Sequence, residues 1–207
     1  NATMGGMAGK TCDGCSRSAR KLTQIDSGQF LCVTCIAELR PPKATDSQIA
    51  YARSLGASFP PDITKADMSC LIDFHVSRDK PPSDRLREIC RQFGISVSPY
   101  SGKRALYNII TETLKAANRD IDLAAWFAFR VLRDLQEHGA VNPSACTPAS
   151  PILRSIAERL ASDAGVMNSM RRYSGRDLMS FGQRTRPDGY VYEGGSKRGL
   201  AYKRARE

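Results

Sequence analysis

The sequence has few of the side chains on which enzymes commonly depend. It contains only two histidines, His75 and His138, which fall in different predicted helices. It has no H-E-x-x-H metalloprotease motif, no P-loop and no dinucleotide-binding glycine pattern. Its acidic residues are scattered and form no recognisable nuclease carboxylate cluster. These absences predict a protein that acts by binding and not by catalysis.

Long apolar segments are also missing. No stretch approaches the ~20 apolar residues that a membrane-spanning helix needs. The N-terminus lacks an apolar signal-peptide core, and residues 1–10 are expected to be a tag remnant or disordered. We therefore expect a cytoplasmic protein. Thiols stay reduced in that compartment, so the seven cysteines do not indicate a disulfide framework.

Basic residues outnumber acidic residues, and their distribution is uneven. The chain has 31 Lys and Arg against 21 Asp and Glu, a net charge of +10, which favours an anionic partner. Residues 1–44 carry six basic and three acidic side chains, and residues 182–207 carry seven and three. Residues 45–100, in contrast, carry seven of each. The expected partner is nucleic acid, DNA or RNA, contacted mainly through its backbone.

Four of the cysteines have the spacing of a zinc site. Two residues separate Cys12 from Cys15 and Cys32 from Cys35, and sixteen residues lie between the two pairs. This spacing lets both sulfurs of a pair reach one ion, and Gly14 permits a tight turn in the first pair. We therefore predict one structural Zn²⁺ ion, held by the four thiolates.

The residues around the cysteines predict a small zinc finger. Residues 22–31 read as two short strands, and residues 36–40 can open a helix that ends before two prolines. Over residues 28–36, Gly-Gln-Phe-Leu-Cys-Val-Thr-Cys-Ile, the chain resembles GATA-type fingers and related treble clefs. The resemblance implies zinc binding. It does not extend to sequence-specific DNA readout, because base-reading apolar residues have no counterpart between Cys15 and Cys32.

The middle of the chain contains an internal repeat. A shift of 38 residues lays residues 45–72 over residues 83–110, with seven identities in 28 positions and agreement at several apolar positions. Each copy reads as helix, extended loop, helix, and a capping box at Thr45 opens the first helix. The identical pairs are Asp46/Asp84, Arg53/Arg91, Gly56/Gly94, Ser58/Ser96, Pro61/Pro99, Lys65/Lys103 and Ile72/Ile110.

Each copy is similar to SAP-type helix–extended loop–helix domains and to a helical module of phage and mobile-element proteins. The resemblance implies DNA binding. Lys65 and Lys103 begin the second helices, where backbone N–H groups can hold phosphates, and Arg104 follows. The balanced charge of residues 45–100 favours a different interpretation equally well, namely a protein-binding or spacing helical pair.

The remaining sequence predicts a helical domain over residues 118–181 and a basic tail. A helix over residues 120–138 has apolar residues at helical spacing, so its aromatic side chains are expected in the core. Arg171 and Arg172 follow in a basic turn. Residues 182–207 are rich in Gly and Arg and are compatible with a short hairpin around Val191. Such a segment can become ordered when it binds nucleic acid, or it can be a simple solvated tail, and the sequence favours both interpretations equally.

These predictions combine into a mainly α, multi-module protein with a small N-terminal zinc-bound β-hairpin. The modules are a four-cysteine finger over 11–42, tandem repeats over 43–117, the helical domain and the tail. The predicted nucleic-acid contacts are Arg17, Arg20, Lys21, Lys65, Lys103, Arg104, Arg171, Arg172, Arg184, Arg186, Lys197, Arg198, Lys203 and Arg204.

The function expected from these features is that of a non-enzymatic, zinc-containing nucleic-acid-binding protein of a mobile element, phage or defence system. Two alternatives stay open. One is a structural subunit that joins other subunits in a nucleoprotein assembly, similar in architecture to the zinc-finger subunit of minimal (type IV) CRISPR surveillance complexes. The other is an adaptor that binds only protein.

Overall fold

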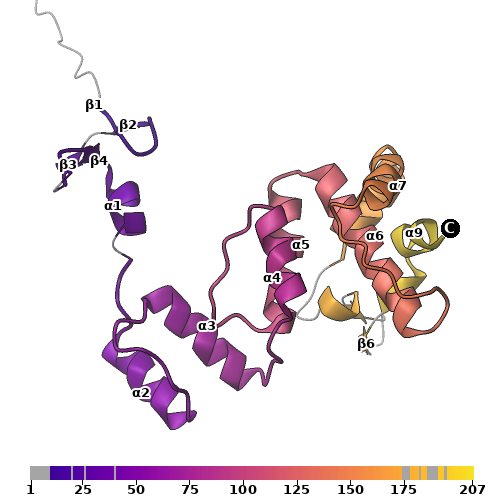
Figure 1. Cartoon of the computed structure of the whole chain (residues 1–207), viewed down its shortest axis with the longest axis horizontal. Coiled ribbons are helices and arrows are strands. Elements are labelled where there is room, and N and C mark those ends of the chain that lie inside the picture. The colour runs from indigo at the N-terminus through magenta and orange to yellow at the C-terminus, as the bar shows by residue number, and fades with distance from the viewer. Residues whose placement is uncertain are drawn as a thin grey trace, which may run out of the picture. The chain divides into compact units, whose positions relative to one another are not determined.

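The computed structural model describes residues 10–19, 21–25, 27–39, 41–173, 178–181, 183–185, 191–193 and 195–207. The chain divides into two compact units, residues 1–72 and residues 73–207. The fold is mainly helical, as predicted, with short antiparallel strands near the N-terminus (Figure 1). Every helix in the described part of the chain is too short or too polar to cross a membrane.

The N-terminal unit begins with two small hairpins. Strand β1 (Lys10–Thr11) pairs with β2 (Ser18–Ala19), and β3 (Thr23–Gln24) pairs with β4 (Phe30–Leu31), both antiparallel. Helix α1 (Val33–Leu39) follows directly. The predicted hairpin within residues 22–31 is therefore confirmed, whereas the hairpin of β1 and β2 was not expected.

Helices α2 (Asp46–Ser54) and α3 (Lys65–Val76) complete this unit, and the boundary between the units falls inside α3. The predicted capping box at the start of α2 is confirmed. The Gln48 backbone N–H donates to Thr45 Oγ1 over 3.2 Å, and the Thr45 backbone N–H donates to Gln48 Oε1 over 3.1 Å. Gly56, just past the helix, has φ +73°, which favours glycine.

The second unit contains helices α4 (Asp84–Gln92) and α5 (Lys103–Ala116), which match α2 and α3 at the predicted offset. The starts of α2 and α4, and of α3 and α5, are each 38 residues apart. Hydrogen bonds recur at the same offset: the Lys65 N–H donates to the Pro42 carbonyl, and the Lys103 N–H to the Lys80 carbonyl, both over 2.7 Å. The two segments therefore share their local geometry as well as their sequence pattern.

The copies differ at the start of the second helix. In the first copy, Thr64 Oγ1 accepts the Asp67 N–H over 3.1 Å. Glycine replaces this threonine at position 102 of the second copy, and the Asp79 carboxylate accepts the Arg104 and Ala105 N–H groups instead, both over 3.1 Å. A Cβ atom at Gly102 would overlap that carboxylate, so the absent side chain makes room for the replacement cap.

The core of the second unit is built around α6 (Asp120–Glu137), which packs against α7 (Pro151–Ala161) and α9 (Leu200–Arg206), while α8 (Ala164–Arg171) packs against α9 (Figure 1). Trp126 is fully buried, and its Nε1–H donates to Thr111 Oγ1 over 3.0 Å. The buried Arg130 guanidinium donates to the Leu178 carbonyl and lies 4.3 Å from the Phe181 ring centroid. The aromatic residues of α6 therefore belong to the core, as predicted.

The C-terminal segment is folded onto this core, which differs from the free or solvated tail expected for residues 182–207. The predicted hairpin is present, with β5 (Gln183–Thr185) antiparallel to β6 (Val191–Glu193). Ala201 and Tyr202 of α9 are buried, because this face of a largely basic helix is apolar. Deleting residues 182–207 would therefore expose core side chains as well as remove charge.

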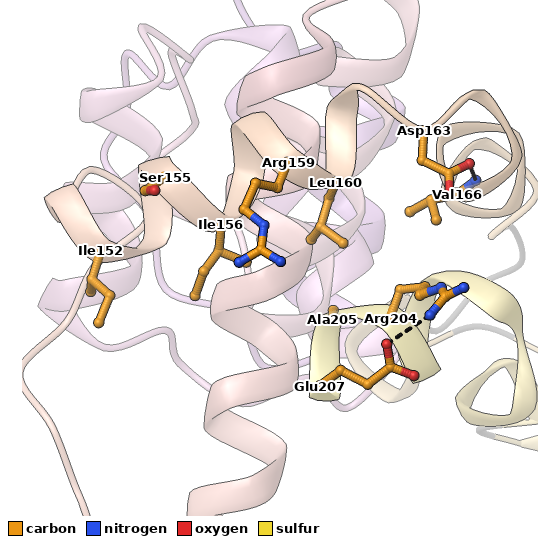
Figure 2. A pocket seen from close by; sticks show the side chains of 10 residues that line it. All are labelled: Ile152, Ser155, Ile156, Arg159, Leu160, Asp163, Val166, Arg204, Ala205 and Glu207. Carbon is orange, nitrogen blue, oxygen red and sulfur yellow. Dashed lines mark hydrogen bonds and ion pairs between the residues drawn. The ribbon is translucent and has the colours of Figure 1, made fainter.

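A hollow of about 630 Å³ lies between α7, the start of α8 and α9 (Figure 2). Ile156, Leu160 and Val166 provide apolar lining, and the Arg204–Glu207 ion pair, 2.9 Å long, contributes charged groups. Asp163 also lines it, but its carboxylate caps α8 by accepting the Gly165 N–H over 2.8 Å. No sequence pattern indicated this hollow, since its walls come from separate segments.

Asp134 of α6 anchors the C-terminal segment. Its carboxylate accepts hydrogen bonds from Lys197 Nζ and the Tyr202 hydroxyl, both over 2.5 Å. Burial raises the pKa of Asp134, but these two donors lower it further than burial raises it, so the pKa lies below its usual range. A carboxylate of this kind stabilises the fold above its unfolded pKa of ~3.9, and the contribution is lost as the pH falls through the folded pKa.

We therefore expect Asp134→Asn to lower the free energy of unfolding of the second unit by about 1–3 kcal/mol at pH 7. The fluorescence of Trp126, the single tryptophan, reports this unfolding in a denaturant titration. The difference from the wild type should shrink below about pH 4. Glu137→Gln changes an exposed carboxylate on the same helix and should have little effect. An equal loss at pH 3 and pH 7 would contradict the proposed role of the charge.

Candidate metal centre

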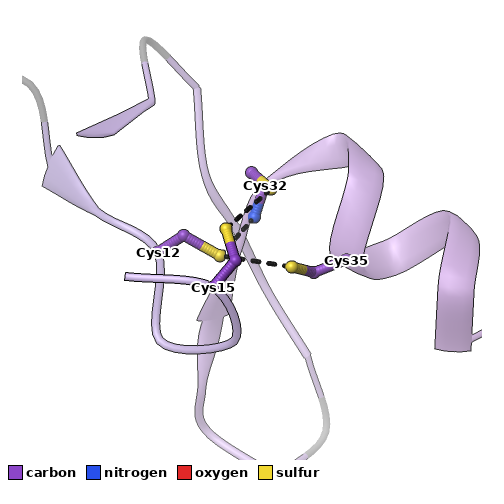
Figure 3. Close-up of side chains that lie close together, drawn as sticks. All are labelled: Cys12, Cys15, Cys32 and Cys35. Atoms are coloured by element: carbon purple, nitrogen blue, oxygen red, sulfur yellow. Dashed lines mark hydrogen bonds between the residues drawn. The ribbon is translucent and has the colours of Figure 1, made fainter. Parts of the chain in front are cut away.

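The four cysteine sulfurs of the finger converge on one point (Figure 3). All lie within 4.8 Å of one another, with Cys12 Sγ 3.7 Å from Cys35 Sγ and Cys15 Sγ 3.9 Å from Cys32 Sγ. A tetrahedral Zn²⁺ ion with Zn–S bonds of ~2.3 Å requires S···S edges of about 3.8 Å. Disulfide sulfurs lie at ~2.05 Å. The predicted cysteine cluster is confirmed, and its geometry fits a metal ion.

Each pair of cysteines is held by a hairpin that leads into the next element. Cys12 follows β1, and its backbone N–H donates to the Arg17 carbonyl over 3.0 Å across the first turn. Cys32 follows β4, and Cys35 lies in the first turn of α1. The local fold therefore delivers two sulfurs from a turn and two from the start of a helix.

Gly14 was predicted to permit a tight turn, but the structure indicates that its small size matters more than its backbone conformation. Ser16, with φ +57°, adopts the left-handed conformation in this turn, and Gly14 does not. A Cβ atom at Gly14 would lie 3.0 Å from Cys35 Sγ and 3.1 Å from Leu31 Cδ2. The glycine therefore allows the first cysteine turn to approach the second pair closely.

Backbone donors favour the thiolate form of two of these cysteines. The Cys32 N–H donates to Cys12 Sγ over 3.2 Å and, against the opposing effect of burial, lowers the pKa of Cys12 to about 6. The Cys35 backbone N–H likewise lowers the pKa of Cys32. Burial raises the pKa of Cys35, whose thiolate therefore needs a cation beside it. The backbone donors therefore favour the thiolate form of Cys12 and Cys32, and a metal ion is needed to keep all four cysteines as thiolates.

The donor set and the small size of the finger favour a structural metal. Four sulfur ligands in a closed tetrahedron suit Zn²⁺, and iron is the other common occupant. Among the described side chains of the finger, the buried apolar residues are Leu31 and the two cysteines Cys12 and Cys35, with a few partly buried neighbours. A core this small needs a metal ion to fold. Cys70, Cys90 and Cys146 are free thiols outside this group.

Two of the predicted nucleic-acid contacts in the finger are described, and both are exposed. Arg17 and Lys21 flank β2 and form no ion pair with a described residue. Arg20 and Arg186 lie outside the described residues. The side chain of Arg184, in β5, is not described either.

The predicted phosphate cradle at the start of α5 is filled by the chain itself. The Lys103 N–H is bonded to the Lys80 carbonyl, and the Arg104 and Ala105 N–H groups are bonded to the Asp79 carboxylate. The first three N–H groups of α5 are therefore not available to a phosphate, and the carboxylate would repel one. The structure corrects this part of the prediction for Lys103 and Arg104. Contacts through their charged side chains stay a prediction.

Several other predicted contacts have acidic or carbonyl partners within the second unit. Arg171 pairs with Asp120 and Lys197 with Asp134, both over 2.5 Å. Arg172 Nε donates to the Asn168 carbonyl over 3.2 Å, and Arg204 pairs with Glu207. Arg198 and Lys203 are exposed and form no ion pair with a described residue, as is true of Lys65 in the first unit.

Comparison of the chain with protein-family models, curated proteins and solved structures finds no match. The resemblances to treble-clef fingers and SAP-type modules therefore stay predictions.

Proposed function

We propose that this chain is a zinc-stabilised nucleic-acid-binding protein whose N-terminal unit contacts the phosphate backbone, and that it acts by binding and not by catalysis. One observation carries the proposal. Every described basic side chain of residues 10–72 is exposed, and none forms an ion pair with a described residue. These side chains are Lys10, Arg17, Lys21, Lys43, Arg53 and Lys65.

The second unit provides the contrast. Seven of its described Lys and Arg side chains form ion pairs with carboxylates: Arg91, Lys115, Arg119, Arg154, Arg171, Lys197 and Arg204. Others there donate to backbone carbonyls, as Arg85 and Arg87 do. The cations of the first unit are therefore the more available ones for a polyanion.

The metal site supports the same proposal because it positions two of these cations. The Arg17 carbonyl accepts the N–H of Cys12, and Lys10 lies two residues before this cysteine. Loss of the metal would release both side chains from a fixed arrangement. Ordered cations give up less conformational entropy on binding than flexible ones. Metal binding and nucleic-acid binding should therefore be linked.

We expect the triple variant Lys10→Ala, Arg17→Ala, Lys21→Ala to weaken nucleic-acid binding and reduce its salt dependence. Each lost phosphate contact should lower the log–log salt slope by ~0.7 for a single strand or ~0.9 for a duplex, about 2 in total if most of the three make contact. Fluorescence anisotropy of labelled oligonucleotides between 50 and 200 mM salt, roughly the range over which such contacts weaken, measures both quantities.

Arg91→Ala is the matched control for the single substitution Arg17→Ala. Arg91 is also an exposed arginine, but it pairs with Glu88 over 2.6 Å in the second unit. Its removal should leave the salt slope unchanged. Equal effects of Arg17→Ala and Arg91→Ala would indicate a diffuse response to net charge, and the proposed role of the first unit would then be wrong.

A second candidate function is an adaptor that binds protein through the finger. Helix α1 leaves two aliphatic side chains in solvent, Val33 at 79% and Leu39 at 60% exposure. Exposed apolar side chains of this kind are common at protein interfaces. Co-purification of a protein partner that is lost in Val33→Asp and Leu39→Asp, without any nucleic acid, would favour this function.

A further inference from the structure

Within the described part of the chain, exposed Phe, Tyr and Trp rings occur in only one of the two units. Among the side chains that the structure describes, Phe30 at 43% and Tyr51 at 49% are the exposed aromatic residues, and both belong to residues 1–72. In the second unit the described Phe, Tyr and Trp rings are buried or half-buried, and many contact one another. The unit in which every described cation is exposed and unpaired therefore also presents these surface rings.

The ring of Phe30 points outward from a strand that is hydrogen-bonded to the first cysteine turn. Side chains alternate along a strand, and the next residue of β4, Leu31, is 3% exposed and faces the finger core. The Phe30 carbonyl accepts the Asp13 N–H over 3.0 Å, and its N–H donates to Asp13 Oδ2 over 2.6 Å. Both bonds tie Phe30 to the turn between Cys12 and Cys15. The metal centre therefore fixes an aromatic ring at the surface.

Tyr51 is exposed at a position that the second repeat buries. Its counterpart 38 residues later, Ile89, is only 1% exposed and belongs to the core of the second unit. Both residues lie at the same position of a nine-residue helix. The difference in their exposure therefore does not come from the helix itself. The first copy thus carries an exposed aromatic residue, two positions before the unpaired Arg53, where the second copy carries a buried aliphatic one.

We infer that the ligand of the N-terminal unit is single-stranded nucleic acid, with bases stacked on Phe30 and Tyr51 and phosphates contacted by Lys10, Arg17 and Lys21. This inference rests on the proposed function and specifies its ligand. Aromatic side chains combined with available cations are the usual means of holding single strands, because every unpaired base offers a π-face. In a duplex these faces are already stacked on neighbouring base pairs, so surface rings add little to duplex binding.

The test uses the full metal-loaded chain with three labelled probes. These are a 16-nucleotide oligo(U), a 16-nucleotide oligo(dT) and a mixed-sequence duplex of about the same length. This length covers typical single-strand sites of ~4–16 nucleotides. We expect both single strands to bind more tightly than the duplex. Phe30→Ala should weaken single-strand binding about 5- to 150-fold without changing the salt slope. Tyr51→Ala should act in the same direction. Comparing oligo(U) with oligo(dT) distinguishes RNA from DNA as the source of the strand.

Two variants separate stacking from other effects. Val33→Ala removes an exposed aliphatic side chain of the same finger and should leave single-strand affinity unchanged. Phe30→Trp keeps an aromatic ring and should retain affinity. Its indole fluorescence should be quenched when a base stacks on it, whereas the fully buried Trp126 gives a constant background.

Two outcomes would overturn the inference while the proposed function stands: equal affinity for single strands and duplex, or equal weakening by Phe30→Ala and Val33→Ala. The second outcome would assign the effect to apolar surface in general. Absence of binding to all three probes at low salt would refute the proposed function itself.

Discussion

Replacing Cys12 and Cys32 together with serine should reduce the metal content from about one ion per chain to nearly zero. Each cysteine pair then loses one thiolate, and serine hydroxyls do not replace thiolates as zinc ligands. The Cys12 sulfur also accepts the Cys32 backbone N–H, so the variant leaves that donor without its sulfur acceptor. Structural zinc in small fingers supplies about 10–16 kcal/mol of apparent binding free energy, which is also folding free energy. The finger should therefore unfold.

Metal analysis of purified protein measures the first effect, and limited proteolysis measures the second. New cleavage sites should appear within residues 10–43, whereas the second unit should stay resistant because its core holds none of the four cysteines. Cys70→Ser and Cys146→Ser are the controls, since both thiols are free and lie outside the cluster. A double variant that keeps one ion per chain would disprove the assigned ligands.

Trp126→Ala should lower the stability of the second unit by about 3–5 kcal/mol. The indole is fully buried, donates to Thr111 Oγ1, and lies 5.2 Å from the Tyr107 ring and 5.9 Å from the Phe129 ring. Its removal leaves a large cavity and a hydroxyl without its donor. For a domain of this size the melting temperature should fall by about 10–20 °C, as measured by calorimetry or circular dichroism.

The metal content should stay near one ion per chain in this variant, because the four ligands belong to the N-terminal unit. Ile121→Ala is the control, since it shortens a side chain of the same helix that is 40% exposed, and it should change stability much less. Similar losses in the two variants would contradict the central position of Trp126 in the core.

The sequence predicted those features that depend on local patterns. Two C-x-x-C pairs bring four sulfurs together through short-range geometry, and the Thr45 box and Gly56 set the ends of one helix. The repeat offset placed the helices of the second copy correctly, because the cap of the first helix, Thr45 or Ser83, and the apolar positions recur with it. Apolar spacing over residues 120–138 likewise identified the buried helix.

Features that depend on contacts between distant residues were missed. Asp79 caps a helix that starts 24 residues later, and neither its own neighbours nor Gly102 indicated this contact. The Gly-rich, basic composition of the C-terminal segment concealed the two buried residues of α9, because a seven-residue helix shows little periodicity. The exposure of Phe30 and Tyr51 followed from neither composition nor spacing, since aromatic residues are more often buried.

The most direct test of the account compares nucleic-acid binding before and after metal removal. The wild-type chain, loaded with zinc, is titrated against labelled oligo(U) at several salt concentrations, and the titration is repeated after chelation. We predict salt-dependent binding by the loaded protein, and a weaker affinity with a smaller salt slope once the metal is removed. No binding by the loaded protein at low salt, or the same affinity and slope in both states, would contradict a metal-organised nucleic-acid interface.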